Sequence, residues 1–115
     1  MVATTFEAQV RAQPSGVTID LSGEINAFAE EALVRAYGEA EQLGATTIVL
    51  NFNDVGYINS TGIALIVSIL ARARKSGRTL AVFGLSDHYL KIFEITRLAD
   101  FMKIYPDEAS AMQAV

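Results

Sequence analysis

The sequence contains little of the chemistry on which most catalytic and metal sites depend. Its 115 residues include no cysteine, which excludes disulfides, thiolate nucleophiles and cysteine-ligated zinc. The single histidine, His88, argues against a histidine metal cluster or a Ser-His-Asp triad. His88 lies in a polar context at the start of an expected helix, which favours a surface histidine over a general base. The adjacent Glu30 and Glu31 project in different directions from a helix, so they indicate a solvated face.

Phosphate-binding glycine motifs and an excess of basic residues are also absent. Gly56 and Gly62 fit neither the Walker nor the dinucleotide-binding pattern, and no lysine follows them at the required position. Nine Lys and Arg against 13 Asp and Glu give a net charge of −4, whereas nucleic-acid binding needs clustered basic residues. The sequence therefore predicts a protein that is not an enzyme, holds no metal or cofactor, and has no nucleic-acid partner.

Long hydrophobic runs are missing as well. The first seven residues carry no basic region and no long apolar stretch, so we expect no signal peptide. The most apolar run, residues 62–71, is about half as long as a bilayer-spanning helix needs to be. These features predict a cytoplasmic protein without direct membrane insertion.

The hydrophobic pattern predicts an α/β fold in one domain covering residues 1–115. Strand patterns occupy residues 7–11, 17–21, 46–52, 79–83 and 102–105. Helical patterns run over residues 27–43 and 60–75, from Ser86 or Asp87, and from 106–107 to Met112. Alternating strands and helices imply a mostly parallel sheet with flanking helices. The first two strands, joined by a short turn, add an antiparallel edge, so the sheet is expected to be mixed.

The most informative segment is Tyr57-Ile58-Asn59-Ser60-Thr61-Gly62-Ile63. It follows a predicted strand and opens a predicted helix, where backbone N–H groups are unsatisfied and the helix dipole is positive. Such a turn suits either a phosphate or a capping hydroxyl. The residues alone leave two interpretations open: a polar helix cap, or a functional site.

The helix after this turn carries apolar residues on two sides. At about 100° per residue, the stripe expected to face the sheet contains Ile63, Ile66, Val67 and Leu70. Leu65 and Ile69 are expected near the opposite side. A second apolar stripe is either covered by a neighbouring helix or presents a binding face, and the pattern leaves both possibilities open.

Phosphorylation at this turn would make a simple binding switch. A phosphate on Ser60 adds about −1.5 to −2 charges, and a helix N-terminus tolerates an anion. The domain should therefore stay folded, and the charge would act on whatever docks against the turn and the side of Leu65 and Ile69. Physical reasoning does not choose between Ser60 and Thr61, whereas Ser68 lies mid-helix without free N–H groups and is a weaker candidate.

Several segments together resemble the STAS family and, within it, the bacterial anti-sigma factor antagonists. They are residues 21–25 (LSGEI), 48–52 (IVLNF), 58–63 (INSTGI), 82–86 (VFGLS) and 95–98 (ITRL). The resemblance implies that an anti-sigma factor, itself a serine kinase, phosphorylates Ser60, and that a phosphatase is a further partner. It implies that the unphosphorylated protein sequesters this anti-sigma factor and thereby regulates sigma-dependent transcription. We therefore expect a partner surface made of Gly23, Glu24, Asn59, Ser60, Thr61, Gly62, Leu65 and Ile69.

The chain departs from this family at three asparagines, Asn26, Asn51 and Asn59, where aspartate is common. Asparagine keeps the size and much of the hydrogen bonding but removes a charge. At Asn59 the loss either slows phosphorylation, if a carboxylate orients the hydroxyl, or makes a phosphate on Ser60 less repulsive. The alternative function is a STAS scaffold that is not phosphorylated, or a transporter-associated STAS subunit. The sequence predicts no particular oligomeric state.

Overall fold

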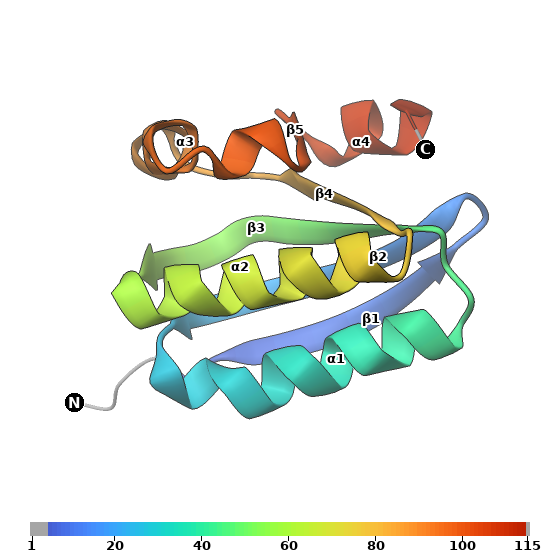
Figure 1. Ribbon diagram of the computed structural model, residues 1–115, viewed down its shortest axis with the longest axis horizontal. Helices are drawn as coiled ribbons and strands as arrows, with labels where there is room; N and C mark the ends of the chain where they lie inside the picture. Colours follow the sequence, from blue (N-terminus) through green and yellow to red (C-terminus); the bar gives the residue numbers. More distant parts are fainter. Residues whose placement is uncertain (1–4, 115) are drawn as a thin grey trace.

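The computed structural model describes residues 5–114, which form a five-stranded sheet in the order β1-β2-β3-β4-β5. The strands are β1 (Glu7–Gln13), β2 (Gly16–Ile25), β3 (Thr47–Ile58), β4 (Thr79–Phe83) and β5 (Lys103–Tyr105). β1 pairs with β2 antiparallel, and the other neighbours pair parallel (Figure 1). The predicted mixed, mostly parallel sheet with an antiparallel edge is therefore confirmed.

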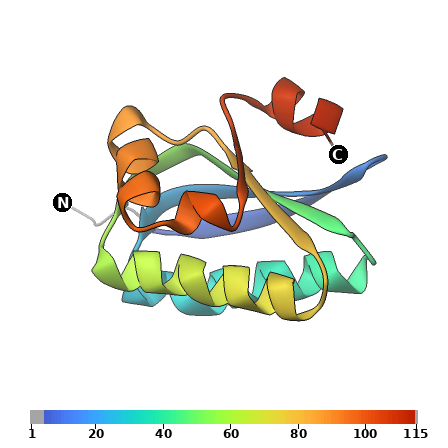
Figure 2. The same ribbon diagram turned by 45° about the horizontal axis from the view of Figure 1, so that its top comes forward.

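The helices lie on both sides of this sheet. α1 (Glu30–Gln42) and α2 (Ser60–Lys75) run side by side against one face, and α4 (Glu108–Ala114) lies on the other side (Figure 2). α3 (Asp87–Ile95) packs against β3, where the Phe93 ring meets the Phe52 ring edge-on at 6.2 Å. Two 3-10 turns, η1 (Ala27–Ala29) and η2 (Leu98–Asp100), precede α1 and follow α3.

The alternation of side chains along the strands divides the core into two unequal parts. Ile19, Ile48 and Leu50 are buried in one large cluster together with residues of α1 and α2. Residues of the opposite parity, such as Val49 and Phe83, form a small second cluster with Ala111 of α4. Because successive side chains of a strand point to opposite faces, the sheet buries apolar residues on both faces of its centre.

Three strands extend further than the sequence predicted: β1 by two residues, to Gln13, and β2 and β3 by more. β2 reaches Ile25 and β3 reaches Ile58, so the strands expected over 17–21 and 46–52 are too short. The extensions of β2 and β3 pair with each other, with register shifts in β2. They contain polar residues such as Asn53 and Asp54, so the apolar pattern of a buried strand does not continue through them. As a result, the exposed Ser60 and Thr61 lie just after the hydrogen-bonded end of β3.

The rotation of α2 also differs from the prediction. The residues that it buries are Gly62, Ile66, Ile69, Leu70 and Ala73. Ile69, expected on a second stripe, is 2% exposed, whereas Val67, expected in the core, is 44% exposed. Ile69 therefore belongs to the core, and Leu65, the other residue of that stripe, is half-buried against it. The reason lies at Gly62, described below.

Candidate functional site

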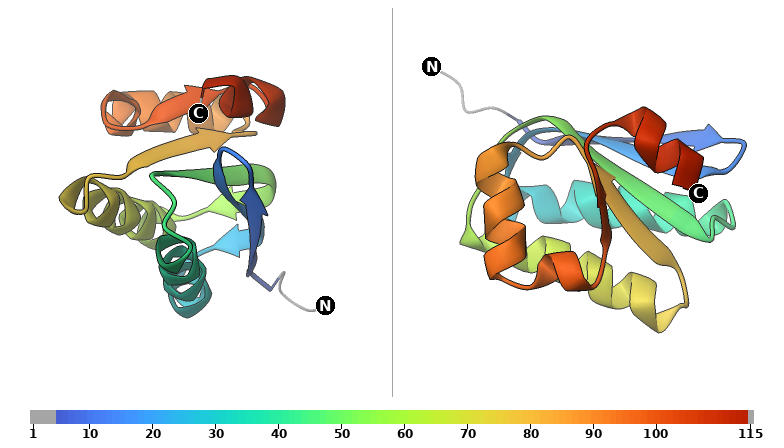
Figure 3. Two further views of the ribbon diagram at one scale, coloured as in Figure 1. Left: turned by 90° about the vertical axis from the view of Figure 1, so that its right-hand side faces the viewer. Right: turned by 90° about the horizontal axis from the view of Figure 1, so that it is seen from above.

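The carboxyl ends of the parallel strands bring three connections to one end of the molecule. These connections are the turn from β2 into η1, the turn from β3 into α2, and the loop from β4 into α3. Figure 3 shows the beginnings of α1 and α2 together at this end. Ser60 is the first residue of α2, and both Ser60 and Thr61 are exposed. In α/β sheets this edge is the usual position of binding sites.

The helix cap at this turn is an asparagine, not a hydroxyl. The Asn59 side-chain oxygen accepts a hydrogen bond from the Gly62 backbone N–H at 2.8 Å, and the Asn59 carbonyl accepts from the Ile63 N–H at 2.9 Å. Within residues 5–114 the Ser60 side chain makes no hydrogen bond of its own. Its hydroxyl therefore remains available for modification without loss of the cap.

Gly62 lets α2 approach the end of β2 very closely. A Cβ atom at this position would overlap the Ile25 carbonyl oxygen and press on the Ile58 side chain. The same Ile25 carbonyl accepts a hydrogen bond from the Asn59 N–H at 3.2 Å. Because only the bare face of Gly62 fits there, the contact determines which side of α2 meets the sheet. This is why Ile69 is buried and Ser60 faces outward.

Tyr89 of α3 holds the end of β3 from the other side. Its hydroxyl accepts a hydrogen bond from the Ile58 N–H at 2.8 Å and donates to the Ile58 carbonyl at 3.4 Å. Tyr89 is 7% exposed, so both backbone groups are satisfied away from water. Sequence reasoning missed this tyrosine, because nothing in the local pattern links it to a residue 31 positions earlier.

The expected partner surface is only partly present. Ser60 and Thr61 are exposed, and Glu24, Asn59 and Leu65 are half-buried. Leu65 packs against the large cluster. The fold buries the other three residues of that surface, Gly23, Gly62 and Ile69.

The burial of Gly23 has a local cause. Its φ of +94° is a conformation that side chains rarely adopt, and a Cβ there would overlap the Thr5 backbone. Gly23 and Gly62 therefore shape this end of the molecule from within, through close backbone approach.

One exposed aromatic at this end was not included in the expected site. Phe28, in η1, has 93% of its surface exposed. The signal in the sequence was its position off the buried face of the following helix. What the sequence could not provide was the contact between η1 and α2, which places Phe28 at the same end as Ser60.

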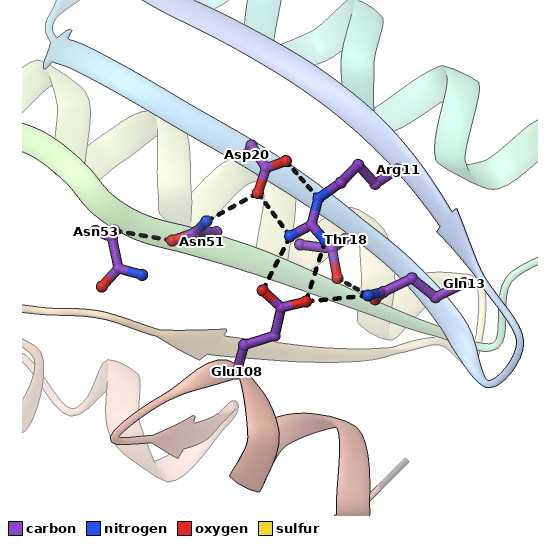
Figure 4. Close-up of polar contacts among 7 residues, drawn as sticks. All are labelled: Arg11, Gln13, Thr18, Asp20, Asn51, Asn53 and Glu108. Atoms are coloured by element: carbon purple, nitrogen blue, oxygen red, sulfur yellow. Dashed lines mark hydrogen bonds and ion pairs between the residues drawn. The ribbon is translucent and has the colours of Figure 1, made fainter.

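A separate polar cluster lies on the face of the sheet that α1 and α2 do not cover, and it connects the sheet to α4 (Figure 4). The Arg11 guanidinium donates to both carboxylate oxygens of Asp20, at 2.5 and 2.9 Å, and to both of Glu108, at 3.1 Å. The Asn51 amide donates to Asp20 at 2.8 Å while its oxygen accepts from the Asn53 N–H at 2.9 Å. An aspartate at position 51 could not donate this bond, so the asparagine is matched to its neighbours.

The charges of this cluster perturb one another. The hydrogen bonds from Arg11 hold the pKa of the Asp20 carboxyl below its ordinary value, and the Asn51 amide adds to this effect. Arg11 and Gln13 likewise lower the pKa of Glu108, and the two carboxylates raise the pKa of Arg11. Arg11, Asp20 and Glu108 thus each favour the charged form, as in a structural ion-pair network. The cluster joins α4 to the β1–β2 hairpin and does not include Ser60.

Within residues 5–114, no three His, Asp or Glu side chains are grouped so that they could hold a metal ion. No helix in this part of the chain has the length and apolar character required to cross a membrane.

Comparison with known proteins agrees with the fold and the sequence resemblance. The STAS domain family model matches residues 7–111. The chain is 30% identical to the anti-sigma-B factor antagonist of Staphylococcus aureus over 86 residues, which cover 75% of this chain and 80% of that protein. An anti-sigma factor antagonist from Mycobacterium paratuberculosis superposes with a TM-score of 0.83 at 20% identity, covering 96% of this chain and 94% of that one. The Bacillus cell fate determinant SpoIIAA in its phosphorylated form gives a TM-score of 0.70 at 22% identity, covering 96% and 100% of the two chains. The chain belongs to the STAS domain family.

Proposed function

We propose that this protein is a cytoplasmic anti-sigma factor antagonist switched by phosphorylation of Ser60. Unphosphorylated, it sequesters an anti-sigma factor that is also a serine kinase, and it thereby releases the sigma factor for transcription. Transfer of a phosphate to Ser60 ends this binding, and a phosphatase restores it. The relatives' names support the role of antagonist, and one structural relative is known in a phosphorylated form.

The observation that carries the proposal is that Asn59, and not Ser60, caps the helix. Asn59 caps α2 through its side chain, while the neighbouring Ser60 hydroxyl is exposed at the first residue of the helix. Phosphorylation would therefore break no bond of the fold, and it would place negative charge where the helix dipole is favourable. The effect of the charge would fall on a partner docked at this end.

Phosphate mapping with the cognate kinase tests the proposal. Each serine-kinase anti-sigma factor of the source genome is titrated into the wild-type protein and the Ser60→Ala variant by calorimetry. The mixtures are then incubated with ATP, and modified residues are mapped by mass spectrometry. We expect one anti-sigma factor to bind both proteins, to modify Ser60 in the wild type, and to lose affinity only for the wild type. Phosphate on Thr61 or Ser68 with Ser60 unmodified would contradict the proposal.

The neutral side chain of Asn59 favours a second candidate, a STAS scaffold or transporter-associated subunit that is not phosphorylated. Replacing Asn59 with Asp separates the two, since a carboxylate can accept the same capping bond from Gly62. Under our proposal, the kinase modifies Ser60 in both the wild type and Asn59→Asp, and the two proteins differ only in the rate of phosphorylation. A scaffold would bind its partner while neither protein acquired phosphate.

A further inference from the structure

Phe28 is the most exposed large hydrophobic side chain in residues 5–114, at 93%. Burial of a phenylalanine side chain is strongly favourable, and the fold leaves this contribution unused. Isolated surface hydrophobes are common, so exposure alone assigns no role to Phe28. Its fixed backbone and its position provide the further arguments.

The backbone around Phe28 is anchored on both sides. The Asn26 side-chain oxygen accepts a hydrogen bond from the Phe28 N–H at 2.9 Å, and the Asn26 carbonyl accepts from the Ala29 N–H at 3.0 Å. Ala29 itself is completely buried. The ring is thus displayed from an ordered 3-10 turn, and ordering it on binding would require little further loss of backbone entropy.

Phe28 also belongs to the same end of the molecule as Ser60. The turn that carries it begins directly after Ile25, whose carbonyl accepts from the Asn59 N–H and lies against Gly62. η1 contacts α2, and Figures 1 and 3 show the beginnings of the two helical segments next to each other. A partner that covers the exposed hydroxyls at the start of α2 would therefore meet η1 as well.

We propose that Phe28 is an aromatic anchor that inserts into an apolar pocket of the anti-sigma factor that binds the Ser60 end. This inference rests on the function proposed above and specifies the partner's complementary surface. Buried aromatics dominate the energy of many protein interfaces, and the polar contacts around them exclude water. A phosphate on Ser60 would bring about −1.5 to −2 charges to the rim of this dehydrated contact, which accounts for the release of the partner.

Truncation of the ring tests the anchor, with a second exposed phenylalanine as a matched control. Phe101 is 51% exposed and lies over the Arg74 guanidinium, against the last turns of α2. Phe28→Ala and Phe101→Ala are titrated by calorimetry against the anti-sigma factor that binds the wild type, and thermal unfolding verifies that both are folded. We expect Phe28→Ala to weaken binding at least tenfold and Phe101→Ala less than twofold.

Three other outcomes would each overturn the proposal, and they can be told apart from one another. If Phe28→Ala binds within twofold of the wild type, Phe28 is no anchor, although the proposed function stands. If none of the anti-sigma factors binds the wild type, the proposed function fails and the anchor with it. A wild-type dimer that dissociates in Phe28→Ala, measured by sedimentation, would assign the ring to a contact between two copies of the chain.

Discussion

Gly62 lies directly against the carbonyl oxygen of Ile25, with no room for a side chain between them. This contact joins the first turn of α2 to the end of β2. It rotates α2 so that Ile66 and Ile69 face the core, and it leaves Ser60 on the outside. The exposure of the candidate phosphoacceptor and the packing of the helix therefore have the same origin.

The first prediction is that Gly62→Ala destabilises the fold. Alanine improves helix propensity by about 1 kcal/mol over glycine, but the added methyl group would overlap the Ile25 carbonyl and the Ile58 side chain. Overpacking of this kind typically costs about 1–3 kcal/mol, so we expect net destabilisation in urea unfolding. In the control Gly38→Ala, the nearest atom to the new Cβ is 3.8 Å away, so the propensity gain should appear as higher stability. Equal stabilisation by both changes would contradict the close approach.

The second prediction concerns Ile69 and Val67, whose positions the sequence pattern reversed. Ile69 is 2% exposed and Val67 is 44% exposed. Truncation of a buried isoleucine to alanine typically costs about 2–5 kcal/mol, whereas surface changes usually stay within about 0.5 kcal/mol. Denaturant unfolding of Ile69→Ala and Val67→Ala should therefore give a large and a small loss respectively. A larger loss for Val67→Ala would support the rotation that the hydrophobic pattern indicated.

The helical wheel failed at Ile69 for a physical reason. Hydrophobicity alone weights Val67 and Ile69 equally, and the orientation of α2 depends on where a residue without a side chain can contact the sheet. The sequence does contain that residue, Gly62, but its neighbour across the contact is the Ile25 backbone, 37 positions earlier. The alternation of side chains along a strand is a local pattern, so it predicted the strands. The rotation of a helix depends instead on such distant contacts.

The third prediction is that the Tyr89 hydroxyl stabilises the strand end before Ser60. Tyr89→Phe removes both hydrogen bonds to Ile58 and leaves a buried N–H without a partner. Such a loss typically costs about 1–3 kcal/mol, measurable by urea unfolding, and the Ile58 amide should exchange faster with solvent. Tyr57→Phe is the control, because Tyr57 is 53% exposed and its change should leave stability nearly unaltered. Unchanged exchange at Ile58 in Tyr89→Phe would rule out this role.

The polar cluster around Arg11 marks the limit of prediction from the sequence. Arg11 and Glu108 are 97 positions apart, and each lies in a segment that reads locally as an ordinary solvated face. Their contact follows only once α4 lies across the β1–β2 hairpin. The order of strands and helices was predictable because it depends on local periodicity, whereas this junction depends on the packing of a short terminal helix.

The fourth prediction follows from the lowered pKa values of Asp20 and Glu108. In the unfolded chain these carboxylates protonate near their ordinary values of 3.8 and 4.5, so their stabilising contribution is present above that range. It is lost as the pH falls through the lower folded values. Since the side chains are 33–41% exposed, each pair should contribute at most about 1 kcal/mol.

The Glu108→Gln variant measures this contribution. Its loss of stability relative to the wild type should be larger at pH 7 than at pH 3 in urea unfolding. Glu31→Gln is the control, because Glu31 pairs with Arg35 on an exposed helix face and should show little pH-dependent difference. A Glu108→Gln loss that stays constant between the two pH values would mean that the ion pair is not the origin of the effect.

The fifth prediction is that charge at Ser60 affects binding and not folding. Ser60→Asp leaves the Asn59 cap intact and places an anion at a helix N-terminus, so unfolding free energy should change by less than about 1 kcal/mol. Affinity for the anti-sigma factor should fall at least tenfold, which corresponds to about 1.4 kcal/mol. Ser68→Asp, which adds the same charge two turns further along α2, should have a much smaller effect on affinity. Equal weakening by the two variants would show that net charge, and not the position of Ser60, governs binding.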